Sequence, residues 1–375
     1  MHEKVVAHIT SVHRRFDVRI NLKQCRALAA AGWSVYLVVA DGNGDELSEN
    51  VQIIDVGEDS GRLRRMAVAS RRVVDRALAL GADIYHLHDP ELLMWAGRIR
   101  RAGRTIVFDA HEDIAAQVFS KPYLPRILMG MVARVSAAVE SRVCRNLDAI
   151  VTATPAIRDK FSQINRRVID INNYPFLDEF APSEVQGHRD NDRICYVGGI
   201  SAVRGIRELV RAMEVDRGRT RLTLFGSFSP RSLESEVRAL PGWKRVDALG
   251  WQSRDRVRHV LARSLAGVVT FLPAPNHVDA QPNKMFEYMS AGLPLIASDF
   301  PLWREIVEGN ECGICVDPEQ PRAIADAIDH LVQNPETARR MGVNGRRAVQ
   351  EVYNWSVEQK KLLDLYERLG DKVSP

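Results

Sequence analysis

One segment of the chain, residues 279–298, joins charged side chains to the start of a helix and reads DAQPNKMFEYMSAGLPLIAS. Pro282 cannot occupy a helix interior, so a helix is expected to begin after it, with Asn283 as its cap. The exposed amides of Asn283, Lys284 and Met285 would then hold a diphosphate at the positive end of this helix.

Two carboxylates accompany that helix start. Glu287 stands one turn into the helix, where its carboxylate can accept two hydroxyl hydrogen bonds, as from a ribose. Asp279 lies on the preceding loop, within reach of the same ligand. The segment therefore predicts a site for a molecule that carries both a diphosphate and a diol.

A second segment with ligand-binding character is YVGGISAVRG, residues 196–205. Gly198 and Gly199 follow an expected strand and would let the backbone approach a phosphate closely. A helix is expected from Gly205, and Arg204 beside it supplies a guanidinium for phosphate oxygens. The same pattern also fits an ordinary turn with a solvated arginine.

Histidines at strand ends suggest a different chemistry. His86 and His88 share one face of a strand and Asp89 follows them, which is how a metal site can begin. With His111 and Asp113 they would make a zinc hydrolase. The residues come from separate strands without a closing ligand spacing, so the sequence favours packed histidines and assigns no metal ligand.

The elements that must position these residues alternate between strands and helices. Strands are expected at 5–9, 35–39, 51–56, 84–88, 105–108 and 149–152, then at 194–197, 222–225, 246–249, 267–271 and 295–297. Helices are expected at 18–31, 62–80, 91–101, 205–213, 255–262, 285–291, 321–332, 335–352 and 356–369. This alternation is typical of doubly wound parallel sheets, which bind ligands at the carboxyl ends of their strands.

The chain length and a break in the pattern indicate two domains. The 375 residues, 45% of them hydrophobic, suit two α/β domains of Rossmann-like type. The predicted division is an N-terminal domain 1–175, a linker 176–192 rich in proline and acidic residues, and a C-terminal domain 193–353. The final helix, 354–375, is expected to cross back to the N-terminal domain.

Composition excludes several classes of protein. The charged share of 27% and the hydrophobic share exclude disordered and collagen-like chains. No apolar run approaches the ~20 residues that span a bilayer. The cysteines are too few for a disulfide scaffold, and the Cys312–Cys315 pair lacks a second pair, so packing in a reduced cytosolic protein is expected.

Basic residues gather in two stretches, 62–76 and 121–145. The second mixes arginines with apolar residues such as Ile127 and Met131. Two solvated helix faces would explain both stretches, and so would a basic, partly apolar face on an anionic membrane surface.

The chain resembles retaining glycosyltransferase family 4, whose members have the GT-B fold. The resemblance rests on the motifs DIYHLHD, VFDAHED, YVGGISAVRG, LTLFGSF, ALGW, PNKMFEYMSAGLPLIASDFPLWREIV and YNWSVEQKKLLDLYERL. They occur in the family's order over essentially the whole chain. The subset it is similar to builds lipopolysaccharide, O-antigen or exopolysaccharide in bacteria.

The resemblance implies roles at matching positions in the second half of the chain. Glu287 matches the glutamate that binds the donor ribose, and Asp279, one methylene shorter than the usual glutamate, matches the residue that approaches the transferred sugar. Arg204 matches a basic residue on the diphosphate. A second basic position is Gly199 here, and Lys284 is expected to compensate.

Other donor-binding positions follow from the remaining motifs. They are Gly198, Gly199, Gly226, Leu249, Gly250, Asn283 and Met285. Leu249 and Gly250 are expected to border the base, with Trp251 beyond them. Gln281-Pro282 replaces the family's usual Phe-Gly pair and removes one amide donor.

In the first half, the resemblance makes His111 the histidine that faces the donor sugar, so His111 and Asp279 are the predicted catalytic positions. A neutral imidazole can donate a hydrogen bond to a sugar hydroxyl or accept one. His13 and Arg19 are expected on the acceptor side of the same site.

The implied activity is retaining transfer of a hexose-type sugar from a UDP- or GDP-sugar to a glycan or lipid-linked acceptor. No cofactor besides the donor substrate, no metal and no nucleic-acid partner are expected, and the location is the cytoplasm, peripheral at the inner face of the plasma membrane. The alternatives are a metal-dependent hydrolase using His86 and His88, a catalytically silent nucleotide-sugar-binding protein, and a GT-B epimerase or phosphorylase.

Overall fold

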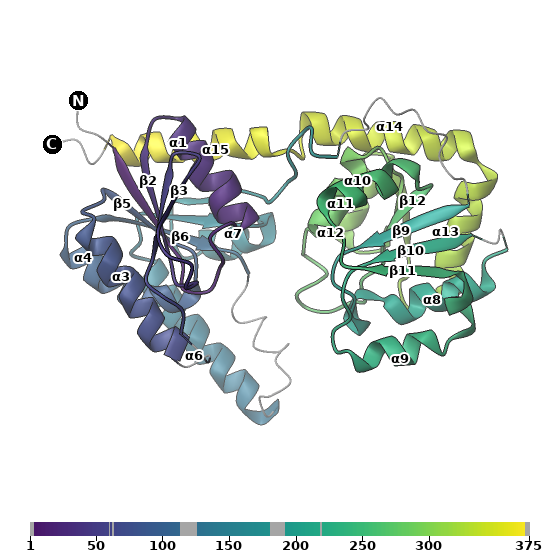
Figure 1. Ribbon diagram of the computed structural model, residues 1–375, viewed down its shortest axis with the longest axis horizontal. Helices are drawn as coiled ribbons and strands as arrows, with labels where there is room; N and C mark the ends of the chain where they lie inside the picture. Colours follow the sequence, from purple (N-terminus) through teal and green to yellow (C-terminus); the bar gives the residue numbers. More distant parts are fainter. Residues whose placement is uncertain are drawn as a thin grey trace. The chain divides into compact units, whose positions relative to one another are not determined.

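The computed structural model describes residues 4–59, 61, 64–112, 126–180, 192–217 and 220–371. The chain divides into two compact units, residues 1–173 with 356–375 and residues 174–355. Each unit is built on one sheet flanked by helices, so the predicted α/β class is confirmed (Figure 1). Most of the predicted linker, 176–192, lies outside the described residues.

The first unit has an eight-stranded sheet of order β3-β4-β2-β1-β5-β6-β7-β8. Its strands are β1 (Val5–Ile9), β2 (Ser34–Val39), β3 (Glu46–Ser48), β4 (Val51–Asp55), β5 (Ile84–Leu87), β6 (Thr105–Ala110), β7 (Ala149–Thr152) and β8 (Val168–Asp170). All pairings are parallel except that of β3 with β4. The central strands are apolar on both faces because helices cover both.

Helical elements of this unit fill the crossovers. They are η1 (Val18–Cys25, a π-helix), α1 (Arg26–Ala30), η2 (Arg65–Ala69), α3 (Ser70–Ala79), η3 (Pro90–Trp95), α4 (Ala96–Arg101), α6 (Arg126–Cys144), α7 (Pro155–Ser162) and α15 (Trp355–Gly370). Because side chains alternate along a strand, Ala7 and Ile9 of β1 join the core that contains Val73 of α3. His8, between them, points to the opposite face, where it meets Tyr366 of α15.

The second unit has a six-stranded parallel sheet of order β11-β10-β9-β12-β13-β14. Its strands are β9 (Arg193–Val197), β10 (Arg221–Phe225), β11 (Val246–Gly250), β12 (Ala266–Val269), β13 (Leu295–Ser298) and β14 (Gly313–Val316). Its helices are η4 (Ala202–Arg204), α8 (Ile206–Val215), α9 (Ser232–Arg238), η5 (Pro241–Arg245), α10 (Arg254–Arg263), α11 (Asn283–Ser290), α12 (Pro301–Val307), α13 (Pro321–Gln333) and α14 (Pro335–Glu351).

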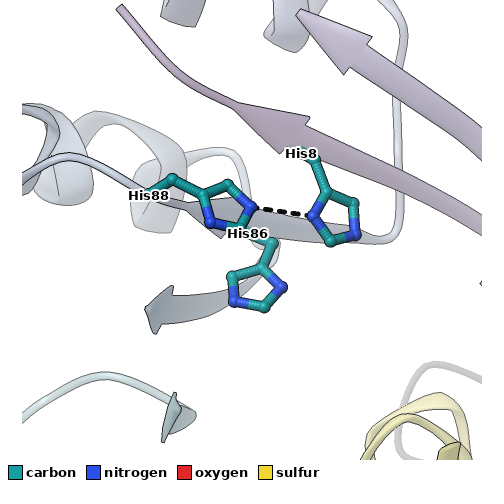
Figure 2. Close-up of side chains that lie close together, drawn as sticks. All are labelled: His8, His86 and His88. Atoms are coloured by element: carbon teal, nitrogen blue, oxygen red, sulfur yellow. Dashed lines mark hydrogen bonds between the residues drawn. The ribbon is translucent and has the colours of Figure 1, made fainter. Parts of the chain in front are cut away.

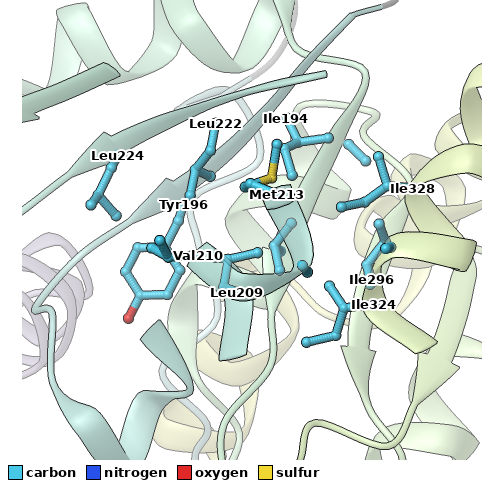
Figure 3. Packing of buried hydrophobic residues seen from close by; sticks show 14 of the residues in the cluster. Ile194, Tyr196, Leu209, Val210, Met213, Leu222, Leu224, Ile296, Ile324 and Ile328 are labelled. Carbon is cyan, nitrogen blue, oxygen red and sulfur yellow. The ribbon is translucent and has the colours of Figure 1, made fainter. Parts of the chain in front are cut away.

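Two hydrophobic clusters cover the two faces of this second sheet. One includes Leu209 and Met213 of α8 and Ile324 and Ile328 of α13, packed on alternate residues of β9 and β10 (Figure 3). The other includes residues of α10, α11, α12 and α14. Helix α11 lies within the predicted ligand-binding segment 279–298. It therefore packs between the sheet and α14.

Several elements differ from the prediction. Strands β3, β8 and β14 were not expected, because each has only three or four residues and too little alternation to be read from sequence. Cys315 lies within β14, Cys312 directly precedes it, and burial raises the pKa of both thiols to about 12. Both are protonated packing residues. Within the described ranges, no helix has the length and apolarity needed to cross a membrane.

Candidate active site

A pocket of about 420 Å³ opens in the second unit at the carboxyl ends of β9 and β10. Its lining residues are Val197, Gly198, Gly199, Phe225, Gly226, Ser227, Trp251, Gln252, Arg254, Val257 and Glu287. This is the edge at which doubly wound sheets bind ligands. The structure thus brings the YVGG turn, the glycine of LTLFGSF and the predicted Glu287 to one cavity.

Two glycines of this pocket lie close to other atoms, and at Gly226 the backbone itself requires glycine. Gly226 has φ of +138°, and a Cβ there would lie 1.9 Å from the Gly198 carbonyl oxygen. At Gly199 a Cβ would lie 2.7 Å from Nη1 of Arg204, whose guanidinium donates to the Gly199 carbonyl oxygen at 2.8 Å. The position where the family carries a second basic side chain is therefore filled by Arg204 itself.

Lys284 lies immediately behind the glycine turn. Its Nζ is buried, has no hydrogen-bond partner among the described residues, and lies 3.7 Å from the centre of the Tyr196 ring. Burial, reinforced by the charge of Arg204, lowers the pKa of Lys284 well below its usual value. A Cβ on Gly198 would come within 3.2 Å of the same Nζ, so the glycine leaves the amine accessible to the turn. Arg204 and Lys284 both lie at this turn, and the amine has no hydrogen-bond partner among the described residues, which favours an anionic ligand.

The beginning of α11 differs from the prediction in its hydrogen bonds. Asn283 is the first helical residue and is exposed, and Pro282 occupies the cap position without a side-chain cap bond, so the prediction that Asn283 caps the helix is wrong. The amide of Met285 donates to the Pro282 carbonyl oxygen at 2.9 Å and the residue is buried, so it is not a free donor. Proline fits this place because its fixed φ suits a helix entry.

The other end of the pocket carries an ion pair that the sequence analysis missed. Nη1 of Arg254 lies 3.2 Å from Oε1 of Glu287, and Arg254 also pairs with Glu179. Desolvation raises the pKa of Glu287, while the Arg254 charge opposes that shift. Arg254 stands in the first turn of α10, where the helix dipole disfavours a cation. This unfavourable position of an arginine is the feature of the sequence that could have identified Arg254 as a site residue.

The remaining positions predicted for the second unit flank the pocket. The Gly250 carbonyl oxygen accepts from the Gly226 amide at 2.9 Å, and the exposed Leu249 accepts from Gln252 Nε2 at 2.6 Å. Asp279 is exposed on the loop before α11. Helix α11 is tied to the β9 end because the Val197 amide donates to the Tyr288 hydroxyl at 2.8 Å.

In the first unit the predicted residues gather around a fully buried carboxylate, Asp109. His111 places Nε2 3.3 Å from Oδ2 of Asp109 and remains partly exposed. His13 stands beside it, with ring centres 4.9 Å apart. Burial alone would lower the pKa of His13, but its hydrogen bond to Asp17 and the charge of Asp89 raise it.

Arg19 does not lie where the sequence analysis placed it. The side chain is buried, Nε and Nη2 donate to Asp109 at 3.0 and 2.7 Å, and Nη1 donates to the Ile171 carbonyl oxygen. The Arg19 guanidinium therefore faces the interior. There its positive charge stabilises the fully buried Asp109 carboxylate. The prediction that Arg19 meets the acceptor is therefore corrected.

Arg19→Met is expected to cost roughly 3–5 kcal/mol of unfolding free energy, because it strands the buried Asp109 charge. The Arg19 charge and the histidine hydrogen bonds hold the pKa of Asp109 well below its usual value in spite of burial. Wild-type stability from this group is fully present above the unfolded pKa and is lost only as the pH falls below it toward the lowered folded pKa, so the deficit of the variant should shrink from about pH 7 to about pH 3. Urea unfolding at both pH values measures this. Arg98→Met, which breaks the exposed pair with Asp75, should cost under ~1 kcal/mol.

Neither carboxylate of the hydrolase alternative joins His86 and His88 in a candidate metal site among the described residues. Asp89 accepts from Thr10 and Ser11, and Asp113 lies outside the described residues. His88, Asp109 and His111 do lie close enough to share an ion. The Arg19 guanidinium already neutralises that carboxylate and would repel a cation placed beside it.

Comparisons with known proteins agree with this geometry. The family model "Glycosyl transferases group 1" matches residues 180–348, and "Glycosyl transferase 4-like domain" matches residues 19–171. An alpha-D-kanosaminyltransferase of Streptomyces kanamyceticus is 23% identical over 68% of this chain and 71% of its own length. A glycogen synthase of Mycobacterium tuberculosis is 22% identical over 91% of this chain and 88% of its own.

Solved structures share the whole architecture. A sucrose-phosphate synthase from Thermosynechococcus elongatus has a TM-score of 0.80 at 20% identity, covering 99% of this chain and 100% of its own. The Anabaena protein Alr3699/HepE in complex with UDP-glucose has a TM-score of 0.74 at 15% identity, covering 97% and 99%. The chain belongs to the glycosyltransferases of the family 4 type and has the GT-B fold.

Proposed function

We propose that this glycosyltransferase moves a hexose-type sugar, with retention at the anomeric carbon, from a UDP- or GDP-sugar to a glycan or lipid-linked acceptor of bacterial surface polysaccharide. The observation that carries the donor assignment is the buried amine of Lys284, which lies behind the Gly198–Gly199 turn and has no hydrogen-bond partner among the described residues. Glu287 lines the pocket together with that turn and supplies the diol acceptor. The structural relative that holds UDP-glucose supports a nucleotide sugar as the ligand.

In this proposal the chain stabilises the departing diphosphate. Arg204, Lys284 and the Gly198–Gly199 turn surround the place where negative charge develops as the sugar leaves. Preorganised charges in a site with little water act strongly on such a transition state. His111 then contributes by a hydrogen bond to a sugar hydroxyl, and Asp279 by approaching the transferred sugar. No resident cofactor or metal is part of the proposed reaction.

Glu287→Gln is expected to abolish most of the thermal stabilisation that a matching nucleoside diphosphate gives, because an amide replaces one of the two acceptor oxygens by a donor. The ligand-free variant should melt slightly higher than wild type at pH 8. The raised pKa of Glu287 means that its charged form costs stability above that pKa, so this difference should shrink as the pH falls.

Thermal shift with UDP, GDP, ADP and dTDP measures both effects. Glu311→Gln is the matched control, since this exposed carboxylate lies outside the pocket. If no nucleotide stabilises wild type, or if Glu287→Gln responds as wild type does, the donor-site proposal fails. Binding of a nucleotide sugar without transfer to any acceptor would support the silent-binder alternative.

We also propose a peripheral location at an anionic membrane, on the cytoplasmic side. Helix α6 exposes Val135 and Val139 next to Arg134 and Arg142, which combines apolar and basic character on an accessible surface. Val135→Glu with Val139→Glu should lower flotation with liposomes rich in phosphatidylglycerol severalfold and leave nucleotide binding unchanged. Equal flotation of the variant and wild type would refute the membrane proposal.

A further inference from the structure

A line of buried aromatic side chains runs through the first unit to Asp109. It consists of Tyr366 of α15 and three histidines, which are His86 of β5, His8 of β1 and His88 directly after β5. Figure 2 shows the three histidines. Nδ1 of His86 lies 2.8 Å from the Tyr366 hydroxyl, which lies 3.5 Å from Nε2 of His8. Nδ1 of His8 lies 2.8 Å from Nε2 of His88, and Nδ1 of His88 lies 3.4 Å from Oδ2 of Asp109.

The three imidazoles of this line are neutral. Each is fully buried, and desolvation lowers the pKa of His8, His86 and His88 below the usual value, for His88 to about 3. Asp109, the described carboxylate that faces them, already accepts from both prongs of Arg19 and from Gln24. Each ring therefore has one N–H donor and one bare acceptor nitrogen, and the positions of the protons follow from the partners.

Asp109 fixes those positions one after another. A carboxylate accepts only, so Nδ1 of His88 carries the proton and Nε2 is an acceptor. Nδ1 of His8 must then donate to that Nε2, which leaves Nε2 of His8 to accept from the Tyr366 hydroxyl. The hydroxyl oxygen in turn accepts from Nδ1 of His86. Only Nε2 of His86 is left without a partner in the described part of the chain, and a bare acceptor costs less than a buried N–H.

The reverse set of proton positions, with each imidazole proton on the other nitrogen, is less favourable at two contacts. It would place a bare Nδ1 of His88 against the Asp109 carboxylate and leave the Nε2–H of His86 buried without an acceptor. It would also offer Nδ1 of His88 as an acceptor to Nε2 of His111, which lies 3.4 Å away. With the proton on Nδ1 of His88, Asp109 is the acceptor for the Nε2–H of His111.

A metal ion is the competing explanation, since nitrogen atoms of His8, His86 and His88 lie within 4.8 Å of one another. Two nitrogens bound to one tetrahedral zinc at 2.0–2.1 Å would lie about 3.3 Å apart. The His8–His88 nitrogen pair is 2.8 Å apart, which is a hydrogen-bond distance. The geometry therefore favours a proton between these rings.

We infer that Tyr366, His86, His8 and His88 are positioning residues that form one directed hydrogen-bond chain. The chain presents an N–H of His88 to Asp109 and thereby keeps the proton of His111 on Nε2. Nδ1 of His111 is then left bare, as an acceptor for a sugar hydroxyl. This last step rests on the proposed function, whereas the proton positions do not.

Long-range ¹H–¹⁵N correlation spectra of the full chain, labelled with ¹⁵N-histidine, test the inference directly. We expect His8, His86 and His88 as the less common Nδ1–H form and His111 as the Nε2–H form, each signal assigned by its own His→Gln variant. A proton on Nε2 of His88, or on Nδ1 of His111, would overturn the inference. So would stoichiometric zinc in the purified protein together with loss of these signals.

Tyr366→Phe tests the direction of the chain. Without the hydroxyl, neither nitrogen of His86 has a partner among the described residues, so His86 should revert to the intrinsically commoner Nε2–H form while His88 keeps Nδ1–H. Tyr353→Phe, which removes a hydroxyl from the second unit, should change no histidine signal. A change at His88 in Tyr366→Phe would show that Asp109 does not set the polarity. These spectra need no donor, so they remain interpretable if nucleotide binding fails.

Discussion

Lys284→Met is expected to lower the affinity for the donor nucleotide sugar by roughly 10- to 100-fold, and to raise the melting temperature of the ligand-free protein. A charged hydrogen bond to the diphosphate is worth about 1.5–3 kcal/mol, which corresponds to that loss. In the ligand-free protein the same amine is buried and has no hydrogen-bond partner among the described residues, so an apolar side chain of similar length removes a cost. The variant should therefore be more stable and less able to bind.

The depressed pKa of Lys284 adds a pH dependence with a definite sign. The diphosphate favours the ammonium form, so binding should take up a proton at any pH above the pKa of the free site, and affinity should fall as the pH rises. Calorimetric titration with UDP-glucose in buffers of different ionisation enthalpy counts the protons.

Lys244→Met changes an exposed lysine of the same unit and should alter neither quantity. Proton uptake that persists in Lys284→Met would assign the uptake to another group. Unchanged affinity for the nucleotide sugar in Lys284→Met would show that Lys284 does not bind the donor.

Gly226→Ala is expected to destabilise the second unit by roughly 3–5 kcal/mol. The new methyl group would overlap the Gly198 carbonyl oxygen, and the backbone φ of +138° is unfavourable for alanine. The turn must then open, which separates the two glycine segments that line the pocket.

Gly250→Ala is the matched comparison. Its φ of +67° is also positive, but nothing lies within 4 Å of the added methyl, so only the backbone cost of about 1–2 kcal/mol applies. Differential scanning calorimetry of the two variants and wild type measures the contrast. Equal losses would mean that the close approach of Gly198 and Gly226 does not constrain the turn.

The alternation of apolar runs with helical segments predicted the fold from the sequence. The order of the motifs predicted which residues line the pocket. Apolar runs such as VVAHI and LTLF are long enough to identify central parallel strands, because these strands are buried on both faces. Glu287 was placed by its position one turn after Pro282. Short edge strands lacked such a signal.

Contacts between distant residues could not be read in the same way. Arg19 and Asp109 are 90 positions apart, and nothing local distinguishes a buried arginine from one that faces a ligand. Arg254 and Glu287 meet across α10 and α11 for the same reason. The arrangement of three histidines and Tyr366 appeared in the sequence only as His-x-His, because register pairs His8 with His86 across β1 and β5.

Helix α15 follows the whole second unit in the sequence but completes the first unit. It supplies Tyr366, whose ring packs edge-on against Trp33 at a centre distance of 5.3 Å and closes off the buried histidines. On the ribosome, the N-terminal half must therefore wait for the entire second half to be synthesised before its interior is sealed from water. A nascent chain stalled before residue 356 would hold a complete second unit beside a first unit whose buried histidines are still exposed to water.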